Sequence, residues 1–234
     1  RFIFSGEMRP DEIILPRGVL DDVVKILTIA GAKVVIRDER IAKRKIKVTF
    51  NGELTEMQQA AVKVWKSHDL GILCAPPGAG KTVMGCAVIA QRKVSTLILV
   101  HRQHLMDQWK KQITKFLGIP PKEIGTMSGS KKKLTGQVDI GSLMSLSNIE
   151  DLSELAQKYS QIIIDECHHV PATSFEAILK QLPARYILGL TATPYRKDGL
   201  EKILFSSVRA HPSRDLISRR RRTYKVSHNP RDRI

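Results

Sequence analysis

The sequence is short of cysteine, of acidic residues and of long apolar runs. Its three cysteines, Cys74, Cys86 and Cys167, have no metal-ligand spacing, which argues against a metal cluster and predicts reduced thiols. No apolar run reaches the roughly 18 residues that a membrane span needs, and no charged-then-apolar leader opens the chain. We therefore expect a cytoplasmic protein without a membrane contact. Because the chain begins at Arg1 and lacks an initiator methionine, we also expect a fragment of a longer protein.

The deficit of acidic residues leaves the chain strongly basic. Its 39 Lys and Arg against 23 Asp and Glu give a formal net charge of +16. The segment 205–234 holds nine of these basic residues and two aspartates, so the part that precedes it is basic as well. Such a charge predicts a polyanionic partner, most simply nucleic acid, although a generic solvated surface would carry part of it.

The most informative segment follows an apolar run at residues 71–74. Ala75-Pro76-Pro77-Gly78-Ala79-Gly80-Lys81-Thr82 has the small residues that let backbone N–H groups turn inward on phosphates where a helix begins. In this pattern Lys81 reaches the terminal phosphates and the Thr82 hydroxyl ligates Mg²⁺. The first glycine of the strict pattern is Ala75, so the match alone is not decisive. The segment predicts a nucleotide site made by Pro77, Gly78, Ala79, Gly80, Lys81 and Thr82.

A second segment lies 84 residues after Lys81 (165 − 81). The apolar β-branched run at residues 162–164 is typical of a strand buried on both faces, and it ends in Asp165 and Glu166. Ligands gather at the carboxyl ends of parallel strands, and both segments occupy such ends. Asp165 is then expected to hold the Mg²⁺ hydration shell, and Glu166 to orient and deprotonate the attacking water. A solvated acidic turn and a metal site at Cys167-His168-His169 are the alternatives, although three consecutive side chains diverge too much to chelate one ion well.

Strand-like and helix-like segments alternate between residues 54 and 191. Strands are expected at 71–75, 95–100, 138–142, 161–165 and 186–191, with a further one near Ile124. Helices are expected at 54–66, from about 80 to 91, and at 103–116, 152–158 and 173–181. This alternation predicts an α/β fold with a doubly wound parallel sheet and helices on both faces.

The two ends of the chain differ from this central part. Residues 1–50 are expected to form a small separate α/β unit, with a helix at 19–30 and strands at 1–4, 12–15, 33–36 and 45–50. After Phe205 the periodicity is lost, so 205–234 is predicted to be a disordered basic tail, although it could grip nucleic acid. The expected domains are therefore 1–50, a nucleotide-binding lobe at 51–204, and the tail.

In this order and spacing, the segments resemble the first RecA-like lobe of superfamily 2 helicases. The resemblance covers residues 54–204, and Asp165-Glu166-Cys167-His168 is similar to the acidic box of that group, in a DECH form. The context from Asp165 to His169, then Gly189–Pro194 and Arg196–Gly199, looks most like type III restriction motor subunits and related repair or recombination translocases. The resemblance implies ATP and Mg²⁺ as cofactors and DNA, or RNA, as the track. In such relatives a small N-terminal unit often touches duplex DNA, which is the role expected for residues 1–50.

The resemblance also assigns roles to single residues near the phosphate segment. Gln58 lies where the group's glutamine reads the adenine edge, and a side-chain amide can donate to adenine and accept from it at once. Met57 stands where the group has an aromatic residue. Arg102 matches a residue that grips a strand phosphate, for which a guanidinium fork is suited. Both Gln58 and Arg102 could instead be ordinary solvated helix residues.

Three further segments complete the resemblance. Ser142 stands in place of a threonine that contacts the nucleic-acid strand. Thr191-Ala192-Thr193, acting with His168, is similar to the segment that passes the state of the γ-phosphate to the nucleic-acid site. Nothing after residue 204 matches the second lobe, which in this group supplies the arginine finger, so slow hydrolysis is expected of this chain alone.

The sequence therefore predicts the ATP-binding half of a DNA helicase or translocase. A restriction motor, with its nuclease carried elsewhere, is a second enzyme hypothesis. A truncated lobe that binds nucleic acid without efficient ATP turnover is the hypothesis from another class, and the basic tail supports it.

Overall fold

The computed structural model describes residues 7–9, 12–14, 20–35, 45–147, 149, 152–169 and 181–193. By its contacts the chain divides into two compact units, one of Arg1–Arg40 with Arg219–Ile234 and one of Ile41–Ser218. The predicted strand at 1–4, nearly all of the predicted helix at 173–181 and the predicted tail at 205–234 lie outside the described residues.

The smaller unit contains a short antiparallel pair and one helix. Strand β1 (Glu7–Arg9) pairs with β2 (Glu12–Ile14), and α1 spans Leu20–Ile29. The helix ends where Gly31 adopts a φ of +75°, a left-handed conformation that glycine takes without a Cβ clash. The strand predicted at 33–36 is wrong over its described part, residues 33–35, because no described segment pairs with it and Val35 is exposed.

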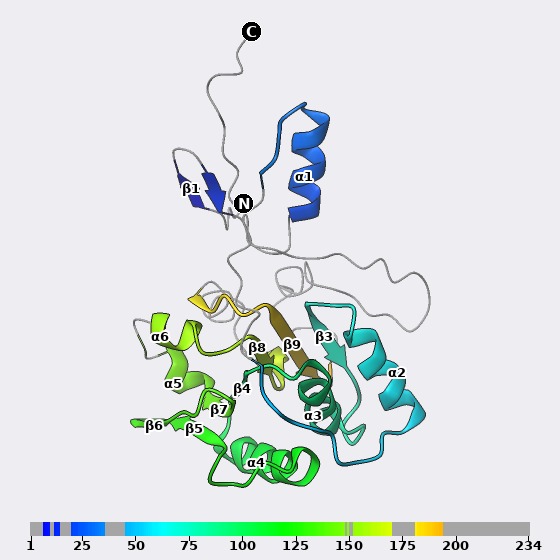
Figure 1. Ribbon diagram of the computed structural model, residues 1–234, viewed down its shortest axis with the longest axis vertical. Helices are drawn as coiled ribbons and strands as arrows, with labels where there is room; N and C mark the ends of the chain where they lie inside the picture. The colour runs from blue at the N-terminus through cyan, green and yellow to red at the C-terminus, as the bar shows by residue number, and fades with distance from the viewer. Residues whose placement is uncertain are drawn as a thin grey trace. The chain divides into compact units, whose positions relative to one another are not determined.

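The larger unit is built on a seven-stranded sheet in the order β3-β9-β8-β4-β7-β5-β6 (Figure 1). Its strands are β3 (Leu70–Cys74), β4 (Thr96–Val100), β5 (Gly125–Ser128), β6 (Lys131–Lys133), β7 (Val138–Ser142), β8 (Gln161–Ile164) and β9 (Tyr186–Thr191). All neighbouring pairs are parallel except the β5–β6 hairpin, which the sequence did not predict. The helices are α2 (Glu56–Trp65), α3 (Lys81–Arg92), α4 (Gln103–Leu117), α5 (Leu143–Ser147) and α6 (Ser153–Ala156), with a 3₁₀ turn, η1, at Cys167–His169.

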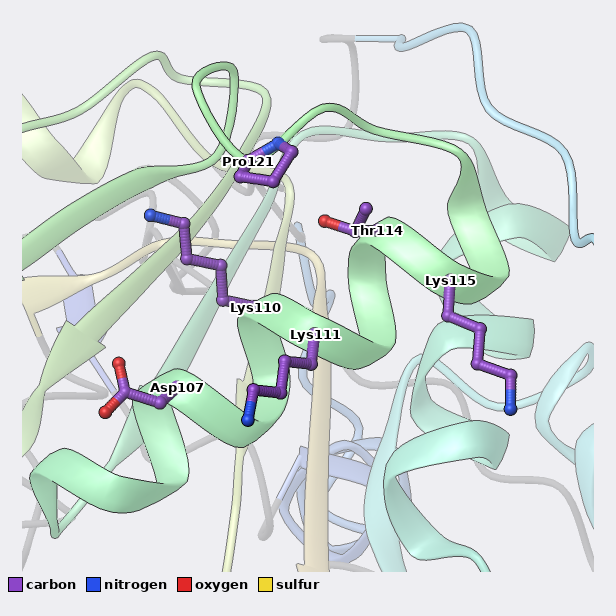
Figure 2. Close-up of a pocket in the computed structure, with 6 residues that line it drawn as sticks. All are labelled: Asp107, Lys110, Lys111, Thr114, Lys115 and Pro121. Carbon is purple, nitrogen blue, oxygen red and sulfur yellow. The ribbon is translucent and has the colours of Figure 1, made fainter.

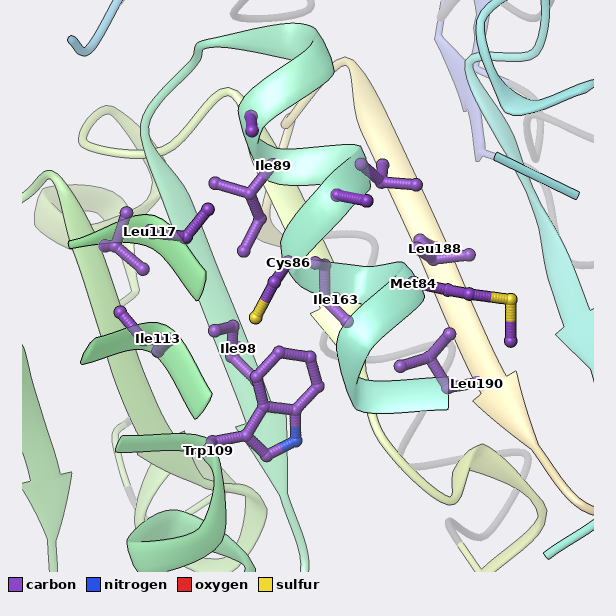
Figure 3. Packing of buried hydrophobic residues seen from close by; sticks show 14 of the residues in the cluster. Met84, Cys86, Ile89, Ile98, Trp109, Ile113, Leu117, Ile163, Leu188 and Leu190 are labelled. Carbon is purple, nitrogen blue, oxygen red and sulfur yellow. The ribbon is translucent and has the colours of Figure 1, made fainter. Parts of the chain in front are cut away.

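Both faces of the central strands are buried, which explains why their sequences contain long apolar runs. In β4, Ile98 and Val100 enter one core with α3 and α4, while Leu97 and Leu99 enter a second core with α5 and α6. Successive side chains of a strand point to opposite faces, so a strand between two helix layers buries apolar residues on both of them. Figure 3 shows the first core, in which the Trp109 ring lies beside Cys86 and Ile98. The predicted doubly wound α/β fold is confirmed.

The segment 45–50 belongs to the larger unit. Ile46 and Val48 are buried in its first core, and the Ile46 N–H donates to the Lys93 carbonyl at 2.9 Å. Only an isolated bridge from Lys45 to Val94 has the pairing of a strand, so the strand predicted at 45–50 is wrong. The boundary predicted at residue 50 is corrected to the division between Arg40 and Ile41, because apolar alternation reports burial and not which unit supplies the core.

Candidate functional site

The segments that the sequence singled out follow neighbouring strands at one edge of the sheet. Strand β9 lies between β3 and β8, and Cys74 at the end of β3 is in register with Thr191 at the end of β9. The last residue of β8, Ile164, pairs with Gly189 of β9. The loop after β3 and the carboxylates after β8 therefore leave the same edge, where ligands gather in parallel sheets.

The loop after β3 has the backbone of an anion cradle. Gly78 and Gly80 adopt φ values of +81° and +80°, and α3 begins directly afterwards at Lys81. Glycine at the N-cap has no side chain to accept from the first-turn N–H groups, so these donors remain for a ligand. With the positive end of the helix dipole they favour a phosphate. Thr82 lies half-buried in this first turn.

Gln58 packs against this loop. It lies in the first turn of α2, where its Oε1 accepts from the Thr55 N–H at 3.1 Å. The Gln58 backbone N–H donates to the Thr55 hydroxyl at 3.4 Å. Its Nε2 donates to the Ala79 carbonyl at 2.9 Å. An amide oxygen can accept twice and an NH₂ group can donate twice, so each still has capacity for a ligand.

We expect Gly80→Ala to destabilise the protein more than Gly78→Ala. Both changes force alanine into a left-handed conformation, at about 1–2 kcal/mol each. A Cβ on Gly80 would also lie 2.6 Å from Gln58 Nε2, whereas a Cβ on Gly78 meets nothing within 4 Å. The Gln58 amide must then give up Ala79, which costs about a further 1 kcal/mol. Urea unfolding of both variants measures the difference. Equal losses, or no recovery when Gln58→Ala is added to Gly80→Ala, would contradict this contact.

Lys81 and Glu166 face each other across the site. Lys81 Nζ lies 3.6 Å from Glu166 Oε1 and donates to the Ala75 carbonyl at 3.3 Å. Glu166 adopts a φ of +46°, which is uncommon for a residue other than glycine and is often found at functional sites. Its second oxygen lies 3.2 Å from His168 Nδ1. A cation and a carboxylate thus lie next to each other beside the glycine loop.

Asp165 is buried and held by two donors. The Trp109 indole N–H donates to Oδ2 at 2.8 Å, and the Glu166 N–H donates to Oδ1 at 3.0 Å. Burial raises the pKa of Asp165 above its ordinary value, while the Trp109 hydrogen bond opposes the shift and the charge of Glu166 adds to it. Trp109 is the functional neighbour that sequence reasoning missed, because a tryptophan within an amphipathic helix looks like any other core residue.

We expect Asp165→Asn to raise the melting temperature at neutral pH. Because the folded-state pKa is raised, the favourable contribution of the protonated carboxyl is lost as pH rises through that value. The uncharged amide avoids this loss. The difference in Tm should therefore shrink as the pH falls through the raised pKa of Asp165 toward the ordinary aspartate value of about 4. Thermal unfolding over this range measures it, and an asparagine variant that is less stable than the wild type at every pH would contradict the account.

The end of β9 is linked to the acidic segment. The Thr191 hydroxyl lies 2.9 Å from His168 Nδ1, and it also donates to the Thr193 carbonyl at 2.9 Å. The Thr193 N–H donates back to the same hydroxyl at 3.2 Å. His168 therefore touches both Glu166 and Thr191, as a residue that couples two segments must.

Arg102 and Ser142 end neighbouring strands at the same edge. Ser142 is in register with Val100, the last residue of β4, and Arg102 follows two positions later as the N-cap of α4. Arg102 is exposed and Ser142 is half-buried. Both positions are open to a ligand that lies across the carboxyl ends of the strands.

A basic groove of about 560 Å³ lies on α4 and the loop after it (Figure 2). It is lined by Asp107, Lys110, Lys111, Thr114, Lys115 and Pro121. The Thr114 hydroxyl is buried and has no hydrogen-bond partner in the part of the chain that the structure describes. Lysines along one helix face suit the phosphates of a polyanion.

Two properties of the described residues bear on other functions. No three His, Cys, Asp or Glu side chains among them are grouped to hold a metal ion, and each helix among them is too short or too polar to span a bilayer. The three cysteines are free thiols, and burial raises the pKa of Cys86 to about 12.

Known proteins share this arrangement. A family model described as "Type III restriction enzyme, res subunit" matches residues 51–196. The DNA 3'-5' translocase XPB2 of Sulfurisphaera tokodaii is 36% identical over 151 residues, which are 64% of this chain and 33% of that relative. The DNA 3'-5' helicase XPB of Kineococcus radiotolerans is 34% identical over 161 residues, which are 66% of this chain and 28% of that relative. The chain thus spans about a third of the length of these curated relatives.

Solved structures show the same fold. The UvsW helicase from bacteriophage T4 matches with a TM-score of 0.60 at 17% identity, over 82% of this chain and 76% of that one. The Sulfolobus solfataricus SWI2/SNF2 ATPase core in complex with dsDNA matches with a TM-score of 0.55 at 18% identity, over 71% of this chain and 38% of that one. The chain therefore belongs to the family of the type III restriction enzyme res subunit, and its larger unit has the fold of these helicase and ATPase structures.

Proposed function

We propose that this chain is the ATP-binding lobe of a motor that couples ATP hydrolysis to movement along DNA. Membership of the family implies ATP use and nucleic-acid binding in general. The observation that carries the proposal is the approach of Lys81 Nζ to Glu166 Oε1 at 3.6 Å, because these groups come from segments far apart in the sequence. A lysine and a carboxylate beside an uncapped helix N-terminus suit the hydrolysis of a phosphoanhydride.

Each residue of the site has a distinct part in this proposal. Lys81 binds the terminal phosphates. The backbone of the segment from Pro77 to Thr82 surrounds them, and every residue of it except Pro77 offers an N–H donor. Glu166 orients the attacking water and accepts its proton, since its carboxylate lies at the same edge of the sheet as Lys81. Gln58 uses its remaining donor and acceptor on adenine.

Mg²⁺ fits the oxygens that are present. Thr82 and Asp165 would hold it, with substrate phosphates and waters completing its shell, which is the usual division of ligands for this ion. When bound, the ion neutralises charge that develops on the phosphates. The Trp109 N–H bond to Asp165 Oδ2 and the Glu166 N–H bond to Oδ1 fix the carboxylate, and each oxygen keeps a further lone pair for the ion or its water.

Arg102 and Ser142 are proposed to grip one DNA strand by its phosphates, and His168 with Thr191 and Thr193 to report the state of the γ-phosphate to them. The small N-terminal unit, which is divided from the larger unit between Arg40 and Ile41, and the basic segment 205–234 are proposed as further DNA contacts. The full-length protein would add a second RecA-like lobe. Because an arginine finger contributes about 10³–10⁵ in rate in related enzymes, this chain alone would turn over ATP slowly.

The proposal is tested by phosphate release with and without duplex DNA. A slow ATPase that DNA stimulates supports the motor. DNA binding with no ATP turnover at all would support a truncated lobe that only binds nucleic acid. The basic charge of the chain is the observation in favour of that alternative. A restriction motor would behave as the first case, and a nuclease domain in the full-length protein would separate the two.

We expect charge reversal in the groove on α4 to weaken DNA binding without changing ATP hydrolysis in the absence of DNA. Lys110→Glu with Lys111→Glu removes two cations that face the groove. If both pair with phosphates, the slope of log affinity against log salt should fall by about 2. Fluorescence anisotropy with a labelled duplex over a salt series measures the slope. Lys63→Glu with Lys66→Glu on exposed positions at the end of α2 is the matched control, and equal slopes for the two variants would contradict the groove contact.

A further inference from the structure

Three imidazole rings lie in a row between the acidic segment and the strand end that precedes Arg102. The ring centroids of His168 and His169 are 3.9 Å apart, and those of His169 and His101 are 4.8 Å apart. His168 and His169 belong to the η1 turn after Glu166, while His101 follows β4 and directly precedes Arg102. Since β8 and β4 are neighbouring strands, the contact joins two adjacent strand ends.

The row begins at the groups assigned to ATP. His168 Nδ1 lies 2.9 Å from the Thr191 hydroxyl and 3.2 Å from Glu166 Oε2. A displacement of Glu166 therefore moves the η1 turn, and with it the ring of His169. The contact from His168 to Thr191 reaches the end of β9. The contact from His169 to His101 reaches the segment that follows β4.

The position of the His101 ring depends on packing. Its Nδ1 is buried and has no hydrogen-bond partner among the described residues, so no bond at this nitrogen anchors the ring. The neighbouring ring of His169 is the aromatic surface that it contacts. A ring held by packing follows its neighbour, because protein interiors are close-packed and transmit small shifts.

We infer that the contact between His169 and His101 transmits the nucleotide state to Arg102, as a second route beside the one through Thr191. His101 and His169 act as positioning residues in this scheme, since neither touches substrate. The inference rests on the proposed function and adds to it a named pathway from the acidic segment to the DNA grip. A row of rings that merely fills space at the edge of the sheet is the alternative.

The test is the ratio of duplex DNA affinities with and without a non-hydrolysable ATP analogue and Mg²⁺, measured by anisotropy on the whole chain. We expect His101→Ala and His169→Ala each to lower this ratio by about threefold to tenfold, in the range seen for residues along coupling routes. The double variant should lose no more than the larger single loss, because both changes break one contact. His101→Phe keeps a ring against His169 and should retain the wild-type ratio.

His104→Ala is the matched control, because His104 is an exposed histidine in the first turn of α4. Thermal unfolding of every variant shows that the fold is retained. Losses that add in the double variant, or single variants with the wild-type ratio, would overturn the inference and leave the proposed function intact. A wild-type chain whose DNA affinity is the same with and without the analogue would overturn both the inference and the proposed function.

Discussion

Lys81→Ala should lower the rate of ATP hydrolysis by about 10²-fold or more, since removing one preorganised group that stabilises transition-state charge has an effect of this size. The Lys81 ammonium lies 3.6 Å from Glu166 Oε1, and Lys81 is the first residue of α3. A bound phosphate would therefore contact the ammonium together with the free N–H groups of the helix. Its loss removes the positive charge closest to the developing negative charge. Phosphate release at saturating ATP, with and without duplex DNA, measures the effect.

A matched control separates this loss from a general effect of charge. Lys63→Ala removes an exposed lysine of α2 and should change the hydrolysis rate by less than about twofold. Binding of duplex DNA without nucleotide should survive in Lys81→Ala, because Arg102 and Ser142 are untouched. A Lys81→Ala protein that hydrolyses ATP within about threefold of the wild-type rate would contradict the assigned role.

Glu166→Gln should abolish turnover while nucleotide still binds. A general base contributes about 10²–10⁴ in rate, and glutamine keeps the length and the left-handed backbone of Glu166 but cannot accept a proton. Because Lys81 and the glycine loop are unchanged, a fluorescent ATP analogue should bind with similar affinity. Rapid-quench measurement of bound ADP then shows whether the chemical step is lost.

Glu166→Gln also separates two roles for the carboxylate. If Glu166 served only as a partner for Lys81, the glutamine variant would lose nucleotide affinity and keep its rate of hydrolysis once saturated. We expect the opposite result, in which nucleotide affinity is kept and hydrolysis is lost. A variant that hydrolyses ATP at the wild-type rate would rule out Glu166 as the base.

The strands of the lobe and the main features of its site could be predicted from the sequence. Runs such as residues 97–100 and 162–164 are apolar at every position because both of their faces are buried, so their type and location followed directly. The glycines at positions 78 and 80 carry the left-handed backbone that the loop requires. These signals are local, and each arises from one physical requirement.

The features that were missed depend on distant partners. The hydrogen bond from Trp109 to Asp165 joins residues 56 positions apart, and no periodic pattern in the sequence predicts it. The segment 45–50 alternates like a strand, yet it lies along the lobe with a single bridge, because alternation reports burial and not pairing. The row from His168 to His101 also forms only when neighbouring strands are placed side by side.

A crystal structure of the chain with Mg²⁺ and a non-hydrolysable ATP analogue would show whether ATP binds between the glycine loop and Glu166. We expect the terminal phosphate to lie between Lys81 and Glu166, with the ion on Thr82 and Asp165 and the adenine beside Gln58. An analogue bound in the groove on α4, or anywhere that leaves Lys81 and Glu166 in mutual contact without a phosphate between them, would contradict it.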